Sequence, residues 1–180
     1  MPIPGKRWYH VTFSTHNSWL PGDPRGFRSK HHRIHSSGDH RNPPPKGEHA
    51  GLHAHAKAIS GRPVMLATTE RTTVGKAVVK TLLKHDHDVL VISVSAMHVH
   101  VLAQLPDDLQ QAKDSVGFAK LSASIRIKNE VPGQVWARGC KPKPIRDEAH
   151  HRNTFAYICR HIDEGAWVWT FRDGSIEEAK

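Results

Sequence analysis

The sequence predicts an α+β domain of ferredoxin-like or RRM-like plan, in which helices pack on one face of an antiparallel sheet. Segments with alternating apolar residues are interspersed with segments of helical periodicity. Two of the predicted strands, residues 88–95 and 97–105, leave room for only a tight turn between them. Interspersed strands and helices with a tight hairpin are typical of α+β domains.

Each element is predicted from its own pattern. The predicted strands and extended segments have alternating or continuous apolar residues; they are residues 7–16, 88–95, 97–105, 134–140 and 166–171. The predicted helices are residues 48–59, 68–85, 108–129 and 147–165. The last helix has Asp147 as a good N-cap and Gly165 as a good C-cap.

The length allows one domain. At 180 residues the chain can bury one sizeable core but not two. We therefore predict a single domain over residues 1–180, with a long loop insertion at about 17–47 that is rich in Gly, Pro, His and Arg.

The composition favours a soluble, nucleic-acid-binding protein of the cytoplasm. The 26 Lys and Arg residues exceed the 17 Asp and Glu residues and leave a formal charge of +9. This excess favours a polyanionic partner such as DNA, although many basic proteins bind no nucleic acid. No apolar run reaches the ~20 residues of a membrane helix, and the two cysteines form no disulfide or zinc framework.

Two histidines, His98 and His100, lie on one predicted strand. Because side chains alternate along a strand, both project from the same face, about 7 Å apart, opposite the apolar face of Met97, Val99 and Val101. Two imidazoles at this spacing can converge on one metal ion. The alternative is a pair of half-exposed strand histidines, which is the better interpretation for His53 and His55 on a predicted helix.

The final predicted helix carries a second pair of polar residues. Tyr157 and His161 are four residues apart and therefore share a helical face. Taken alone, Tyr157 would be interpreted as an amphipathic residue at the edge of the contact between helix and core. The histidine pair on the strand changes that interpretation.

Together these motifs resemble the single-tyrosine HUH transposases, which include small insertion-sequence transposases and REP-associated tyrosine transposases. The resemblance is carried by "YHVTFSTHNSWLPGDPRGF", "SAMHVHVLAQLP", "QVWARGCKPKPIRDE" and "YICRHIDEGAW", in this order from Tyr9 to about Trp169. It implies a DNA-binding, metal-dependent endonuclease that cleaves and rejoins single-stranded or hairpin DNA through a covalent phosphotyrosine, in support of DNA transposition and recombination of a mobile element.

The resemblance also implies the site residues. Tyr157 corresponds to the nucleophile on the C-terminal helix, and His98 and His100 correspond to metal ligands. His161 stands where relatives often have Gln or Asn, and it would be the third ligand. The alternative is that His161 continues the polar stripe of the helix and hydrogen-bonds solvent or DNA. The resemblance implies Mg²⁺ or Mn²⁺, and because a nitrogen donor favours later first-row metals, we predict a preference for Mn²⁺.

DNA-binding residues are predicted from the basic segments. One group precedes the final helix and combines cations with an aromatic ring; it comprises Trp136, Arg138, Lys141, Lys143 and Arg146. Arg25 and Arg28 in the long loop could also contact a phosphate backbone. The alternative for both groups is a solvated basic loop.

The sequence is compatible with two functions. The first is the DNA-cleaving enzyme, and the second is a domesticated relative that binds DNA hairpins and regulates without cutting. The presence of His98, His100 and Tyr157 together favours the enzyme. The sequence leaves open whether the chain acts as a monomer or a homodimer.

Overall fold

The structure, a computed structural model, describes residues 3–27, 34–38 and 41–174. The chain divides into two compact units, one formed by Met1–Thr15 with Met65–Lys180 and the other by His16–Val64. We call them the sheet unit and the insertion unit. Within the described residues no helix is both long enough and apolar enough to span a bilayer.

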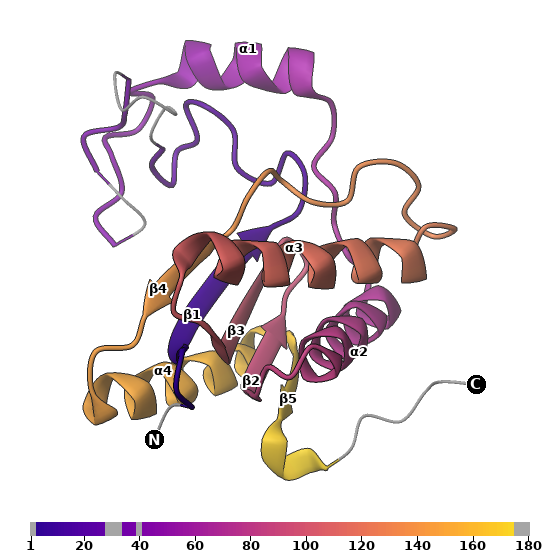
Figure 1. The fold of residues 1–180 in the computed structure, drawn as a ribbon. Helices are drawn as coiled ribbons and strands as arrows, with labels where there is room; N and C mark the ends of the chain where they lie inside the picture. Colours follow the sequence, from indigo (N-terminus) through magenta and orange to yellow (C-terminus); the bar gives the residue numbers. More distant parts are fainter. Residues whose placement is uncertain (1–2, 28–33, 39–40, 175–180) are drawn as a thin grey trace. The chain divides into compact units, whose positions relative to one another are not determined.

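The sheet unit is built on a five-stranded sheet in the order β4-β1-β3-β2-β5, and every pair of neighbours is antiparallel (Figure 1). The strands are β1 (Lys6–Ser14), β2 (Val89–Val94), β3 (His98–Pro106), β4 (Lys141–Pro144) and β5 (Trp167–Thr170). A tight turn joins β2 to β3, where the Ser95 amide donates to the His98 carbonyl at 2.9 Å. The predicted α+β class, the antiparallel sheet and the hairpin are confirmed.

One face of the sheet is apolar and covered by two helices, α2 (Thr68–Lys84) and α3 (Leu109–Arg126). Phe13 of β1 lies opposite Val99 of β3, so both point to this face, and the ammonium of Lys120 on α3 lies 5.6 Å from the centre of the Phe13 ring. Both apolar residues are buried. This face therefore holds the main core, as the alternation of β3 predicts.

The opposite face carries α4 (Glu148–Arg160). Ile158 of α4 packs on Val91 of β2 and Leu102 of β3, and none of these three side chains is exposed. The prediction that the helices pack on one face is therefore correct for α2 and α3 but not for α4. The physical reason is that Leu102 lies on the same face as His98 and His100. This apolar side chain is stabilised by burial away from water, and α4 provides that burial.

The start of α4 agrees with the prediction, but the α-helix ends at Arg160 and not at the predicted Gly165 cap. The Asp147 carboxylate accepts a hydrogen bond from the His150 amide at 2.7 Å and caps the first turn. The helix ends at Arg160 and continues as a short 3-10 helix, η1 (His161–Glu164), which Gly165 closes in the left-handed conformation.

The edge strand β4 was not predicted as a strand. Residues 134–140 were expected to be extended, but they make one isolated bridge, between Trp136 and Thr15, and pairing with β1 begins at Lys141. Pro142 and Pro144 lack amide hydrogens, so this segment can pair only on one side and is confined to an edge. A short run of lysines and prolines has no alternation of apolar residues, so the sequence pattern does not predict this strand.

Gly75 allows α2 to approach the sheet closely. A methyl group at this position would collide with the ring of Trp167 on β5. We expect Gly75→Ala to destabilise the fold by about 1–3 kcal/mol through overpacking, measured as a lower midpoint of denaturant unfolding. Gly117→Ala on α3 is the matched control, because nothing lies within 4 Å of its added methyl. It should raise stability slightly. Equal midpoints for Gly75→Ala and the wild type would contradict close packing at Gly75.

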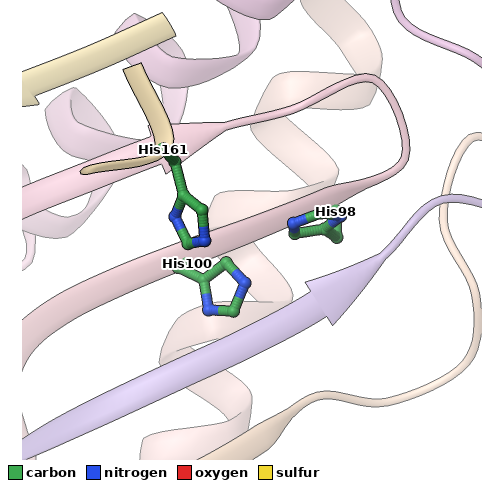
Figure 2. Close-up of side chains that lie close together, drawn as sticks. All are labelled: His98, His100 and His161. Atoms are coloured by element: carbon green, nitrogen blue, oxygen red, sulfur yellow. The ribbon is translucent and has the colours of Figure 1, made fainter. Parts of the chain in front are cut away.

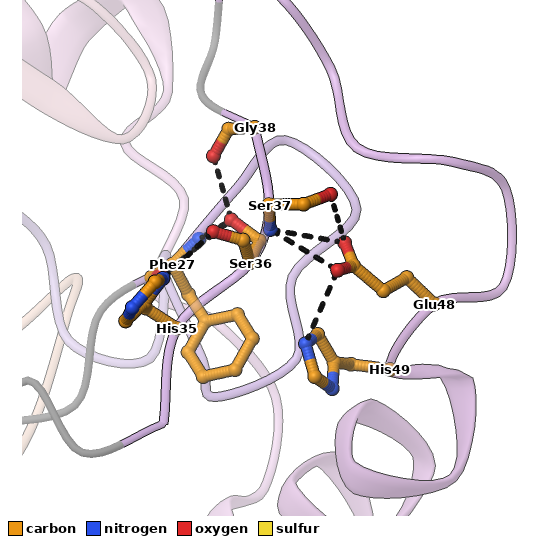
Figure 3. A network of polar contacts seen from close by, with 7 residues as sticks. All are labelled: Phe27, His35, Ser36, Ser37, Gly38, Glu48 and His49. Carbon is orange, nitrogen blue, oxygen red and sulfur yellow. Dashed lines mark hydrogen bonds and ion pairs between the residues drawn. The ribbon is translucent and has the colours of Figure 1, made fainter.

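The insertion unit contains α1 (Ala50–Ser60), which confirms the predicted short helix. Its chain ends meet where the Val64 amide donates to the His16 carbonyl at 3.0 Å. Figure 3 shows further polar contacts, in which the amide and hydroxyl of Ser37 donate to the Glu48 carboxylate. The described part of the predicted loop is therefore held by specific hydrogen bonds.

Candidate functional site

Three histidines meet on the face of the sheet that α4 covers. His98 and His100 project from β3, and His161 is the first residue of η1. One ring nitrogen from each lies within 4.8 Å of the others, and Figure 2 shows the three rings converging. His161 is buried, and the other two are half-buried. The structure thus brings together the three residues predicted as metal ligands, among them the histidine that lies 61 positions along the chain from His100.

Two features of the fold produce this convergence. Alternation on β3 points His98 and His100 to the same face. The docking of Ile158 on Leu102 then brings the end of α4 over the strand. Ser93 of β2, which lies opposite His100, accepts or donates a hydrogen bond of 2.9 Å at Nδ1 of His161 and fixes its ring.

The cluster fits a divalent transition metal. Imidazole nitrogens bind such ions at ~2.1 Å, so two nitrogens on one ion are at most about 4.2 Å apart. The ring nitrogens of the cluster, which lie within 4.8 Å of one another, are close to this range. Three neutral nitrogen donors leave coordination positions for other ligands, as in catalytic sites.

Burial keeps the imidazoles of His100 and His161 neutral, which metal binding requires. Burial first, and then the charges of neighbouring groups such as His98, lower the pKa of His100 to about 2. Burial also lowers the pKa of His161, while the neighbouring Glu164 carboxylate acts in the opposite direction. Near neutral pH both rings therefore offer a free lone pair.

Tyr157 lies beside the cluster. Its ring centre is 4.8 Å from that of His161 and 5.6 Å from that of His100, with the rings edge to face. The side chain is 41% exposed. The structure therefore places the predicted nucleophile next to the predicted metal ligands of the same chain, with part of its surface exposed to solvent.

His10 of β1 belongs to the site but was missed in the sequence. Its Nε2 lies 2.9 Å from Nδ1 of His100, and the two rings stack with centres 5.2 Å apart. Burial lowers the pKa of His10 to about 4, and the charge of Lys143 contributes to the shift. Alternation in "KRWYHVTFS" places His10 on the face opposite the core, but only the pairing of β1 with β3 shows that it reaches His100.

The predicted DNA-binding lysines lie next to this site. On β4, Lys143 pairs with His10 and Lys141 pairs with Thr12, which itself lies opposite His100. Both lysines therefore point to the histidine face, and both are exposed. Arg138 and Arg146, on either side of β4, are also exposed.

Trp136 is not available for base stacking, contrary to its predicted role. Its side chain is 7% exposed and its ring packs edge to face on Phe13, with centres 5.1 Å apart. The indole nitrogen donates to the Lys120 carbonyl at 2.8 Å. The bridge to Thr15 turns this residue into the core beneath α3, so it stabilises the fold.

In the insertion unit, Arg25 has partners within the unit. Its guanidinium donates to the buried Asp23 carboxylate at 2.6 Å and lies 4.2 Å from the centre of the Trp19 ring. These contacts order the loop, and a DNA contact of Arg25 stays a prediction. Arg28 lies outside the described residues.

Comparison with solved structures shows a likeness in fold. No protein-family model matches the chain, and no curated protein matches its sequence. The fold is similar to a solved structure described as a REP-associated tyrosine transposase bound to a REP hairpin, with a TM-score of 0.47 and 14% identity over 92% of this chain and 72% of that one. This description names the group of proteins that the sequence motifs resemble. At such low identity, we infer the function from the side chains of the site itself.

Proposed function

We propose that this chain is a metal-dependent tyrosine transposase that cleaves and rejoins single-stranded or hairpin DNA through a covalent phosphotyrosine. One observation carries the proposal: the ring centre of Tyr157 lies 4.8 Å from that of His161, one of three clustered histidines that could hold a metal ion. A nucleophilic hydroxyl beside an open site for a divalent ion is the arrangement that phosphoryl transfer requires.

Each side chain has a role in this chemistry. His98, His100 and His161 would hold a Mn²⁺ or Mg²⁺ ion, which when bound withdraws charge from a phosphate oxygen. The Tyr157 oxygen attacks phosphorus and loses its proton to solvent. The bond from phosphorus to one sugar oxygen breaks, and that oxygen takes a proton. Because the phosphotyrosine conserves the bond energy, a free hydroxyl end can reverse the step and rejoin DNA without ATP.

The direct test is the covalent adduct. The full chain is incubated with labelled single-stranded oligonucleotides from its own genomic flanks and Mn²⁺, and the products are separated on a denaturing gel. We expect a labelled band at the mass of the protein plus the DNA fragment. Hairpin binding without any adduct would support the regulatory alternative, and cleavage without an adduct would show hydrolysis by a different nucleophile.

Lys141 and Lys143 are proposed to contact the DNA phosphates beside the cleaved bond. Both lysines are exposed on the edge strand and point to the histidine face. Arg138 and Arg146 would extend the same basic edge.

Replacing Lys141 and Lys143 together by Gln should weaken single-strand binding about tenfold at low salt. The slope of log K against log salt should become shallower by about 1.4, since each lost phosphate contact on a single strand contributes ~0.7. Lys76→Gln with Lys84→Gln on α2, the helix of the opposite face, is the matched control. If the double substitution on β4 leaves the salt slope unchanged, or if the control substitutions change it equally, Lys141 and Lys143 do not contact the DNA.

His161 should determine the metal preference. As a third nitrogen donor it favours Mn²⁺ over Mg²⁺, whereas Gln at this position would supply an oxygen donor and move the preference towards Mg²⁺. We expect His161→Gln to raise the ratio of adduct formed with Mg²⁺ to that formed with Mn²⁺ by about tenfold.

His85→Gln is the control for this experiment, because His85 stacks on Phe118 away from the cluster. Its metal preference should match that of the wild type. An unchanged preference in His161→Gln would show that this side chain does not bind the ion.

A further inference from the structure

Two of the three clustered histidines, His100 and His161, each have a hydrogen-bond partner at the ring nitrogen Nδ1. His10 Nε2 lies 2.9 Å from Nδ1 of His100, and Ser93 Oγ lies 2.9 Å from Nδ1 of His161. An imidazole has two nitrogens, and a neutral ring carries its hydrogen on only one of them. The partner of Nδ1 therefore decides whether Nε2 has a free lone pair.

We infer that His10 and Ser93 are positioning residues, which hold His100 and His161 with the hydrogen on Nδ1 and leave Nε2 to bind the metal. This inference rests on the proposed function, because the positioning of the rings matters only if the histidines bind a metal. In this arrangement Nδ1–H of His100 donates to His10 Nε2, and Nδ1–H of His161 donates to Ser93 Oγ. The reverse donation from His10 would place the hydrogen of His100 on Nε2 and block that nitrogen as a ligand.

The fold gives His10 this position independently of any ion. On the paired strands His10 lies directly opposite Leu102. His100 is two residues before Leu102 on β3, so it is the diagonal neighbour of His10 on the same face. The His10 and His100 rings also stack at an interplanar angle of 29°, so the orientation of one restricts the other. Rotation of His100 would break both the hydrogen bond and the stacking contact.

Ser93 has an equally fixed place. It lies on β2 between His100 of β3 and Val168 of β5, and it has no exposed surface. A buried hydroxyl needs a partner within the protein. The only polar residue in the otherwise apolar segment "VLVISV" thus meets the ring of His161 instead of water.

The first experiment reads the tautomer without metal. Long-range ¹H–¹⁵N spectra of the metal-free chain, with histidine labelled in the ring, distinguish hydrogen on Nδ1 from hydrogen on Nε2. We expect His100 to carry it on Nδ1. In His10→Leu, which keeps the bulk but offers no acceptor, His100 should shift to a mixture of both tautomers. His10→Gln, whose amide oxygen reaches about as far as Nε2, should retain the wild-type tautomer.

The second experiment measures Mn²⁺ binding by calorimetry. His10→Leu should bind Mn²⁺ about 10–100-fold more weakly than the wild type, the usual effect of losing a partner of a metal-binding histidine. His10→Gln should lie within a few-fold of the wild type. Ser93→Ala should weaken binding, and Ser93→Thr, which keeps the hydroxyl, should restore it. Unfolding midpoints show whether each variant is folded.

Two results would overturn the inference: a wild-type His100 with its hydrogen on Nε2, or a folded His10→Leu that binds Mn²⁺ as tightly as the wild type. Both differ from a failure of the proposed function, which would appear as absence of the covalent adduct. The tautomer of wild-type His100 remains decisive even if His10→Leu does not fold.

Discussion

Replacing Tyr157 by Phe is expected to abolish the covalent protein–DNA adduct, with a loss of at least about a thousandfold in single-turnover cleavage. The phenol oxygen is the atom that would bond to phosphorus, and Phe lacks it. The ring remains and keeps its edge-to-face contacts with His100 and His161. Because the side chain is 41% exposed, loss of the hydroxyl leaves no buried group unsatisfied, and DNA binding should stay within a few-fold of the wild type.

Tyr9→Phe is the control for this variant, since Tyr9 is the second of the two tyrosines in the sequence. Its side chain is 3% exposed, and its hydroxyl donates to the Asp107 carbonyl at 3.0 Å on the other face of the sheet. This variant should form the adduct at nearly the wild-type rate. An adduct that persists in Tyr157→Phe would refute the assignment of Tyr157 as the nucleophile.

The second large effect is expected from the histidine pair. His98→Ala and His100→Ala each reduce three nitrogen donors to two, too few to hold a weakly bound ion such as Mn²⁺. We expect calorimetric Mn²⁺ binding to fall below detection and cleavage to fall by at least about a hundredfold. Added Mn²⁺ should restore little activity.

His55→Ala provides the comparison for the histidine pair. His55 belongs to another His-x-His pair of the chain, on α1; it is exposed and is not part of the histidine cluster that could hold a metal ion among the described residues. Its metal binding and cleavage should match those of the wild type. Wild-type Mn²⁺ affinity in His98→Ala would exclude His98 as a ligand, and the same holds for His100.

Local periodicity was enough to predict the main parts of the site. The two-residue repeat of β3 placed His98 and His100 on one face, and the helical repeat placed Tyr157 and His161 together. These patterns depend only on the geometry of a single strand or helix. The meeting of the strand with the helix was not predictable from either pattern and was implied by the resemblance to a family.

Contacts between elements account for what the sequence did not reveal. His10 reaches His100 only through the register of β1 against β3, which sequence alternation does not determine. Trp136 stands beside several cations in sequence, yet its bridge to Thr15 turns it into the core. The face that α4 covers was also missed, because one apolar residue, Leu102, among polar neighbours decides it.

The placement of the ligands on two elements has a thermodynamic consequence. His98 and His100 belong to the sheet, whereas His161 follows directly on the helix that carries Tyr157. An ion bound by all three histidines would link β3 to η1, the short helix that directly follows α4. If the ion binds only when α4 is packed on the sheet, it stabilises that packed arrangement by RT ln(1 + [L]/Kd). Each tenfold rise in free ion above Kd then adds about 1.4 kcal/mol to the free energy of separating the helix from the sheet. Removing the ion would withdraw this contribution and leave the packing of Ile158 on Val91 and Leu102 to hold α4 on the sheet.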